Sequence, residues 1–159
     1  MNTMVLAVKI VLDKWRSSIK NFDDLLLELS DETLLREIVP SKNRGIYLLG
    51  HLLAVHDDML VLLDMGNKLY PQWNDAFLKH ADKVISDIPG CTELRQAWII
   101  QAKAIQQKFD ALPSEQWFEK HRAISDQDFA LEPHRNKLNV VLTRINHLQY
   151  HIGQLALLK

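Results

Sequence analysis

Apolar residues recur at spacings of three and four along four long stretches of the chain, and this periodicity is typical of amphipathic α-helices. We expect these helices to span about residues 2–29, 41–65, 92–112 and 136–158, with Ser41 or Asn43 as the N-cap of the second. No convincing run of alternating apolar and polar residues indicates a strand. The pattern therefore predicts an all-α fold, in which each apolar seam packs on another helix.

Two long connections separate these stretches, at about residues 66–90 and 113–136. In the first, Pro71 begins what reads as a short helix, and we expect Trp73 and Phe77 to pack under it. Long connections often cover a site, so this segment is a candidate lid or side wall. The second is polar and irregular, which favours a surface connection with at most a small hairpin.

Composition fits a single domain over residues 1–159. The chain holds only five Gly and five Pro, and so few turn-forming residues favour long helices over many short strands. Its formal net charge is −1, so nothing suggests a general affinity for nucleic acid or for an anionic membrane. We therefore expect a four-helix bundle with long crossover connections. Its seams could support a homodimer as well as a monomer.

The single Cys91 excludes an intramolecular disulfide and fits a reducing compartment. It follows Pro89 and Gly90 in an apparent turn, which favours an inert small residue over a nucleophile. The N-terminal residues show no cationic segment leading into a long apolar run, and no uncharged stretch is long enough to span a bilayer. We expect a cytoplasmic protein.

His147 and His151 stand four residues apart in the last predicted helix. This spacing puts both rings on one helix face, about 5–6 Å apart at Cβ. Two such rings can share one metal ion if a third ligand comes from elsewhere in the chain. They can equally be two ordinary surface or half-buried side chains. Arg144, one turn earlier, would point into the same region.

His51 lies in the middle of the very apolar second helix, where a buried imidazole needs a partner. It is either a core histidine bonded to a carbonyl or carboxylate, or a third metal ligand. Gly50 just before it would let another helix or a ligand approach closely, although it could equally be a tolerated glycine with no such role. His56 lies about 140° around the helix from His51 and is the weaker candidate. The other histidines fall in polar connections and are expected to be solvated: His80, His121 and His134.

Two segments together resemble the DinB/YfiT-like superfamily, and the resemblance covers essentially the whole chain. They are Gly50-His51-Leu52 and His147-Leu148-Gln149-Tyr150-His151-Ile152-Gly153-Gln154. The resemblance implies a four-helix bundle with long crossovers and a divalent metal held by His51, His147 and His151. Some members are S-transferases that use low-molecular-weight thiols such as bacillithiol or mycothiol, and related isomerases and hydrolases exist.

Three neutral imidazoles suit zinc or nickel foremost, with iron or copper as alternatives. Asp58, Asn146 or backbone carbonyls are candidates to orient the ligating rings. Gln101, in the buried stripe of the third helix, could be an outer hydrogen-bond partner but reads more readily as a boundary residue. Two functions remain open. One is a metal-dependent enzyme acting on a small-molecule substrate, such as a thiol transferase or hydrolase. The other is a non-catalytic, stress-related protein that binds a metal or ligand. No catalytic base can be chosen.

Overall fold

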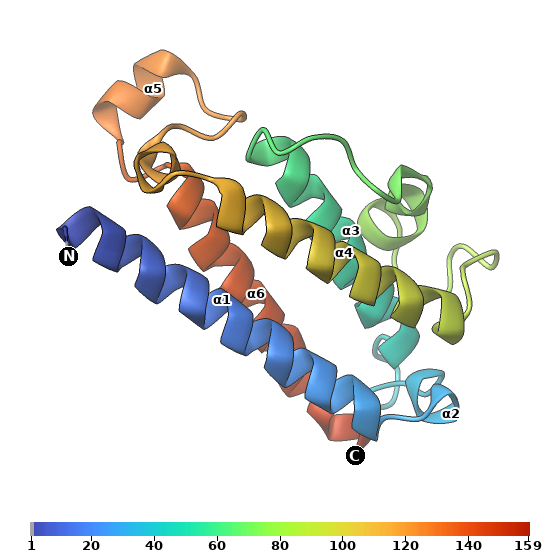
Figure 1. Ribbon diagram of the computed structural model, residues 1–159. Helices are drawn as coiled ribbons and strands as arrows, with labels where there is room; N and C mark the ends of the chain where they lie inside the picture. The colour runs from blue at the N-terminus through green and yellow to red at the C-terminus, as the bar shows by residue number, and fades with distance from the viewer. Residues whose placement is uncertain (1) are drawn as a thin grey trace.

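The computed structural model describes residues 2–159, and within this range the chain is helical with no β-strand (Figure 1). The all-α prediction is therefore confirmed. The long helices are α1 (Thr3–Glu28), α3 (Gly45–Leu62), α4 (Cys91–Ala111) and α6 (Lys137–Leu155). They coincide with the four apolar-periodic stretches because each has one side to bury and few internal breakers.

The second long helix is shorter than predicted at both ends. Its N-cap is Arg44, because Ser41 adopts a left-handed backbone conformation with φ of 66° in the turn before the helix. Asp82 fixes Arg44 by accepting hydrogen bonds from its backbone N–H, at 2.8 Å, and from its guanidinium. At the other end Asp64 is left-handed, with φ of 58°, so the helix stops at Leu62 and does not reach Met65.

Short helical segments fill the connections. They are α2 (Asp31–Leu34), the 3-10 helix η1 (Pro71–Trp73), the π-helix η2 (Asp75–Lys79), η3 (Ser114–Phe118), α5 (Asp126–Leu131) and η4 (Ala156–Leu158). The small hairpin considered for the second connection does not form. Ser125 caps α5 by accepting the N–H of Asp128, and only an isolated bridge joins Lys120 to Asn136.

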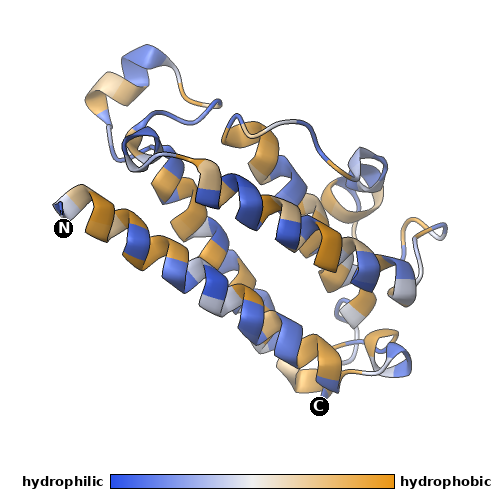
Figure 2. Cartoon of the chain, viewed as in Figure 1, coloured by the Kyte–Doolittle hydropathy of each residue, from blue (hydrophilic) through white to orange (hydrophobic). Residues whose placement is uncertain are grey.

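The long helices pack in a defined order, with α6 against α1 and α3, and α3 against α4. In Figure 1, α3 and α6 run in opposite directions. Figure 2 shows apolar and polar residues sharing each long helix, in keeping with one face turned inward. Trp73 and Phe77 are buried in the same core cluster as much of α3, as the sequence predicts.

Helix α3 is long and apolar enough to cross a membrane by length and composition alone. Yet 67% of it is buried inside the fold, as expected for the central helix of a helical core. Its burial explains why its apolar residues show little segregation to one face: neighbouring elements cover it on several sides.

Gln101 is a core residue, so its interpretation as a boundary residue was wrong. The side chain is 0% exposed, and Nε2 donates to Oδ1 of Asp57 at 2.6 Å and to the carbonyl of Leu53 at 3.0 Å. Asp57 also accepts the backbone N–H of Tyr70 at 2.5 Å. This buried network links α4, α3 and the connection that follows α3.

Candidate metal centre

Three histidines from two helices converge on one point. His51 comes from α3, and His147 and His151 come from successive turns of α6. Nε2 of His147 lies 3.2 Å from Nε2 of His51 and 3.0 Å from Nε2 of His151. One ring nitrogen from each residue lies within 4.8 Å of the other two. The third candidate ligand and the i, i+4 pair are therefore brought together as predicted.

The ring of His51 is oriented by the backbone of η2. Its Nδ1 lies 2.9 Å from the carbonyl oxygen of Phe77. A carbonyl can only accept, so Nδ1 carries the hydrogen and Nε2 keeps a free lone pair. The i→i+5 pattern of a π-helix is rare and occurs often at functional sites. Here η2 brings the Phe77 carbonyl to His51, which a sequence pattern does not reveal.

Gly50 makes this approach possible. A Cβ atom at Gly50 would lie 2.3 Å from Cε1 of the Phe77 ring, far inside van der Waals contact. The missing side chain lets the fully buried Phe77 ring rest against α3 beside His51. The expectation of a close approach at Gly50 is confirmed, and the approaching group is Phe77.

His151 is oriented by its own helix. Its Nδ1 lies 2.7 Å from Oε1 of Gln154, one turn further along α6. The Nε2 amide of Gln154 in turn donates to the hydroxyl of Tyr150 at 3.2 Å. With Nδ1 of His151 donating to Gln154, its Nε2 also keeps a free lone pair. Tyr150 is 64% exposed, so this short chain of hydrogen bonds runs from the histidines to the surface.

The outer partners differ from the candidates chosen by sequence. Asp58 pairs with Lys68, and Asn146 is exposed; neither is hydrogen-bonded to the three histidines. A backbone carbonyl was among the predicted partners, and the carbonyl of Phe77 has this role for His51. Gln154, the partner of His151, was not predicted. Its signal was available, because residues three apart on a helix are neighbours.

His147 lies between the other two histidines, and its ring has the fewest hydrogen bonds to orient it. Its Nδ1 is buried and has no hydrogen-bond partner within residues 2–159. Burial, aided by the neighbouring His151, His51 and Arg144, lowers the pKa of His147 to about 4. Burial likewise lowers the pKa of His151, against the opposing effect of Gln154. Both rings are therefore neutral, the form that ligates metals, at neutral pH.

The donor set fits a divalent ion. Bound at ordinary zinc–nitrogen distances in a tetrahedral arrangement, three imidazole nitrogens lie about 3.3 Å apart. Two of the three separations, 3.2 and 3.0 Å, are within a few tenths of an ångström of that value, and the third is no more than 4.8 Å. Two of the three rings already have the outer hydrogen bond that typically accompanies a ligating histidine.

The other histidines stay outside the cluster. His56 is buried against Trp15 and Trp98, with ring centroids 5.1 and 5.3 Å away. It faces away from His51, as its position on α3 predicts. His134 is exposed as expected, while His80 and His121 are only partly exposed. Nδ1 of His80 lies 2.9 Å from the carbonyl of Asp75, which ties it to η2.

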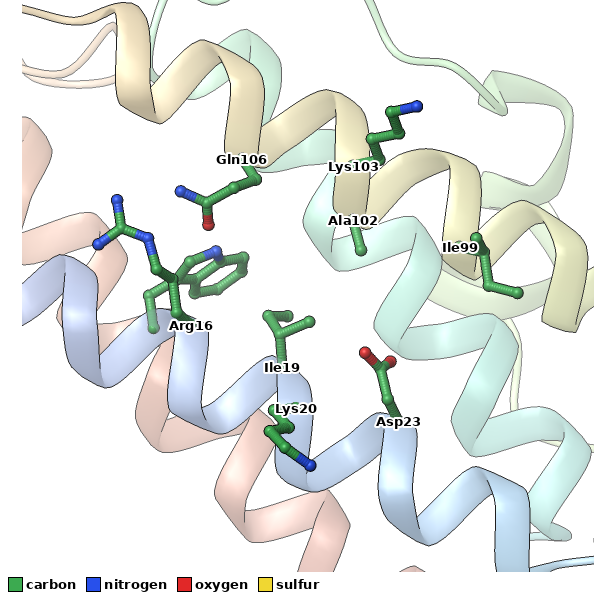
Figure 3. Close-up of a pocket in the computed structure, with 9 residues that line it drawn as sticks. Arg16, Ile19, Lys20, Asp23, Ile99, Ala102, Lys103 and Gln106 are labelled. Carbon is green, nitrogen blue, oxygen red and sulfur yellow. The ribbon is translucent and has the colours of Figure 1, made fainter.

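A separate hollow of about 320 Å³ lies between α1 and α4 (Figure 3). Arg16, Lys20 and Lys103 contribute charged side chains around its apolar floor, with Asp23 at one end. No histidine or cysteine lines it. This hollow therefore lacks the ligand set of the histidine cluster.

No family model matches the chain, and no curated protein matches it.

Proposed function

We propose that this chain is a metal-dependent enzyme of the DinB/YfiT-like kind, in which His51, His147 and His151 hold one divalent ion. The observation that carries the proposal is the convergence of three Nε2 atoms, two of them on rings whose Nδ1 faces an oxygen acceptor. The four long helices and the two segments that resemble the superfamily also support a four-helix bundle with long crossovers.

The proposed reaction is the transfer of a small electrophile to a low-molecular-weight thiol. The thiol sulfur forms a bond to the electrophilic carbon, the leaving group departs with the bonding electrons, and the thiol proton passes to solvent. A divalent ion in such a site supplies positive charge and open positions that lower the pKa of a bound thiol or water. The chain contributes neutral ligands, fixed by Phe77 and Gln154, in a half-buried setting that strengthens electrostatic interactions.

Zinc and nickel are the first choices for the ion. Three imidazoles without a thiolate or carboxylate do not distinguish strongly among late divalent metals, so availability contributes to the choice. Iron and copper remain alternatives for the same reason.

One observation favours the second candidate, a non-catalytic protein that binds a metal or ligand. Within the described part of the chain, no carboxylate is hydrogen-bonded to any of the three histidines. Acid–base catalysis usually needs a positioned proton acceptor, so this arrangement favours a binder over a hydrolase. Among the enzyme reactions it supports thiol transfer better than hydrolysis.

The test begins with the metal content of protein purified without a His-tag, measured by mass spectrometry, for the parent and His147→Ala. We expect close to one divalent ion per chain in the parent and a large loss in the variant. A conjugation assay then combines bacillithiol, mycothiol or cysteine with monochlorobimane. A rate that follows metal content supports the enzyme. Bound metal without a rate above the uncatalysed reaction supports the binder, and a metal-free parent rejects both metal-based functions.

A further inference from the structure

A hollow of about 370 Å³ lies between α3 and α6, towards the C-terminal end of α3. Asp58, Val61 and Leu62 line it from α3, Arg144 lines it from α6, and Arg122 and Lys68 close it from the connections. Its volume is in the range of sites for small molecules, about 300–1,000 Å³.

The hollow lies one to two helical turns from the histidines, along the same two helices. On α3, Asp58 is two turns beyond His51 on the same face, a rise of about 10 Å. On α6, Arg144 is one turn from His147, a rise of about 4.5 Å. The end of the hollow lined by Arg144 is therefore the end nearest the histidine cluster.

The lining carries excess positive charge. It holds three cationic side chains and the single carboxylate of Asp58, which is paired with Lys68. Arg122 forms only a loose, exposed pair with Asp64, at 3.7 Å. The positive charge of the lining is thus largely free to act on a ligand.

Arg144 is the unusual member of this set. It is half-buried, and Nε is buried with no hydrogen-bond partner within residues 2–159. No carboxylate in the same range forms an ion pair with it, since Asp58 acts on it only from beyond ion-pairing distance. A guanidinium stays charged even when buried, and an unpaired buried donor is costly. The guanidinium of Arg144 therefore has no anionic partner within the described protein and is free to bind one from solution.

We propose that this hollow binds the carboxylate of a small organic acid, with Arg144 as its main contact. The planar guanidinium matches a carboxylate through two parallel hydrogen bonds. Val61, Leu62 and Ala123 offer apolar surface to the body of the same molecule. This inference rests on the proposed function and extends it. It states that the substrate used at the histidine site carries a carboxylate.

The test uses tag-free, metal-free protein and follows its backbone amides by ¹H–¹⁵N NMR during titration with benzoate. Benzamide, which has the same shape without the charge, is the matched control ligand. We expect benzoate to shift amides near Asp58, Leu62, Ala123 and Arg144, and benzamide to shift them far less. Equal responses to the two ligands would overturn the proposal, as would binding of inorganic phosphate as tight as that of benzoate.

Arg144→Met should weaken benzoate binding by roughly tenfold or more, and Arg144→Lys by less, because a lysine keeps the charge without the fork. Unchanged binding in Arg144→Met rejects the assignment. If that variant does not fold, Ala123→Trp decides. Ala123 is exposed, and a tryptophan there fills the hollow from the surface. Benzoate binding that survives this substitution places the ligand elsewhere.

Metal analysis of the same tag-free protein separates this inference from the proposed metal. Benzoate binding is measured on metal-free protein, so its result does not depend on whether the three histidines hold an ion. If the parent binds benzoate but holds no metal, the anion site stands and the metal enzyme fails. If it holds metal but shows no preference for benzoate over benzamide, the metal site stands and the carboxylate substrate fails.

Discussion

The ring of Phe77 occupies the space in which any side chain at position 50 would begin. An added Cβ at Gly50 would lie 2.3 Å from Cε1 and 2.4 Å from Cζ of that ring. The carbonyl of the same Phe77 accepts the Nδ1–H of His51. A single glycine on α3 thus determines how closely η2 can approach the candidate metal ligand beside it.

Gly50→Ala should therefore impair both stability and the site. Displacing a buried ring to admit a methyl group costs about 1–3 kcal/mol in a packed core. Moving Phe77 also removes the acceptor that orients His51, so metal affinity should fall. Urea unfolding and zinc titration measure the two effects.

Gly153→Ala is the matched control for this substitution. Gly153 lies in α6 between two site residues, but an added Cβ there meets nothing within 4 Å. Alanine should raise the free energy of unfolding by about 0.5–1 kcal/mol through helix propensity, and leave zinc affinity unchanged. Similar results for the two variants would contradict the steric account of Gly50.

Replacing His51, His147 or His151 by alanine should each cut metal affinity strongly. The far-ultraviolet circular dichroism of the metal-free variants should stay close to that of the parent. The reason is that two apolar clusters spanning the long helices hold the fold, unlike a zinc finger, which unfolds without its ion. Treating the parent with a chelator should likewise leave its helix content intact.

His134→Ala is the control for the three ligand variants, because His134 is exposed and lies in the connection before α6. His80→Ala is a second control at the C-cap of η2, the helix that carries the acceptor for His51. Neither should alter zinc or nickel affinity by more than about twofold. The metal assignment is lost if His51→Ala and His147→Ala bind these ions as tightly as the parent.

Gln154→Leu should weaken metal binding by about 10- to 100-fold, the usual effect of removing an outer partner of a ligating histidine. Gln154→Glu keeps an oxygen acceptor at Nδ1 of His151 and should retain affinity. Asn146→Leu makes a comparable change at an exposed position of the same helix and should have no effect. If both leucine variants behave alike, Gln154 does not orient His151.

The buried His56 should make the protein sensitive to acid. Burial lowers its pKa to about 3, so the folded state takes up no proton there until far below the usual value of 6.5. The unfolded chain binds that proton near pH 6.5, so the unfolded state gains protons first and stability falls as pH drops from 6.5 toward 3.

His56→Phe tests this effect. Phenylalanine keeps an aromatic ring between Trp15 and Trp98 and removes the proton site. Urea unfolding of the metal-free proteins at pH 7 and pH 5 should show about 2 kcal/mol less loss of stability in the variant. Parallel losses in parent and variant would mean that His56 takes up its proton in the folded state.

Local information in the sequence predicted much of this molecule. The four long helices were predictable because helical periodicity and breakers act over a few residues. The pairing of His147 with His151 followed for the same reason, since residues four apart on a helix share a face. The ends of α3 were predicted wrongly because they depend on more than the local pattern. Ser41 and Asp64 adopt left-handed backbone conformations, and the N-cap Arg44 is fixed by the distant carboxylate of Asp82.

Other features depend on contacts between elements that lie far apart in the sequence. His51 meets His147 only because α3 packs antiparallel to α6, and the carbonyl that orients it comes from a π-helix 26 residues away. Gln101 becomes a core residue because another helix supplies Asp57. A single helix specifies which side chains share a face. Only packing decides which face it meets, and therefore which polar groups find partners and which, like Arg144, do not.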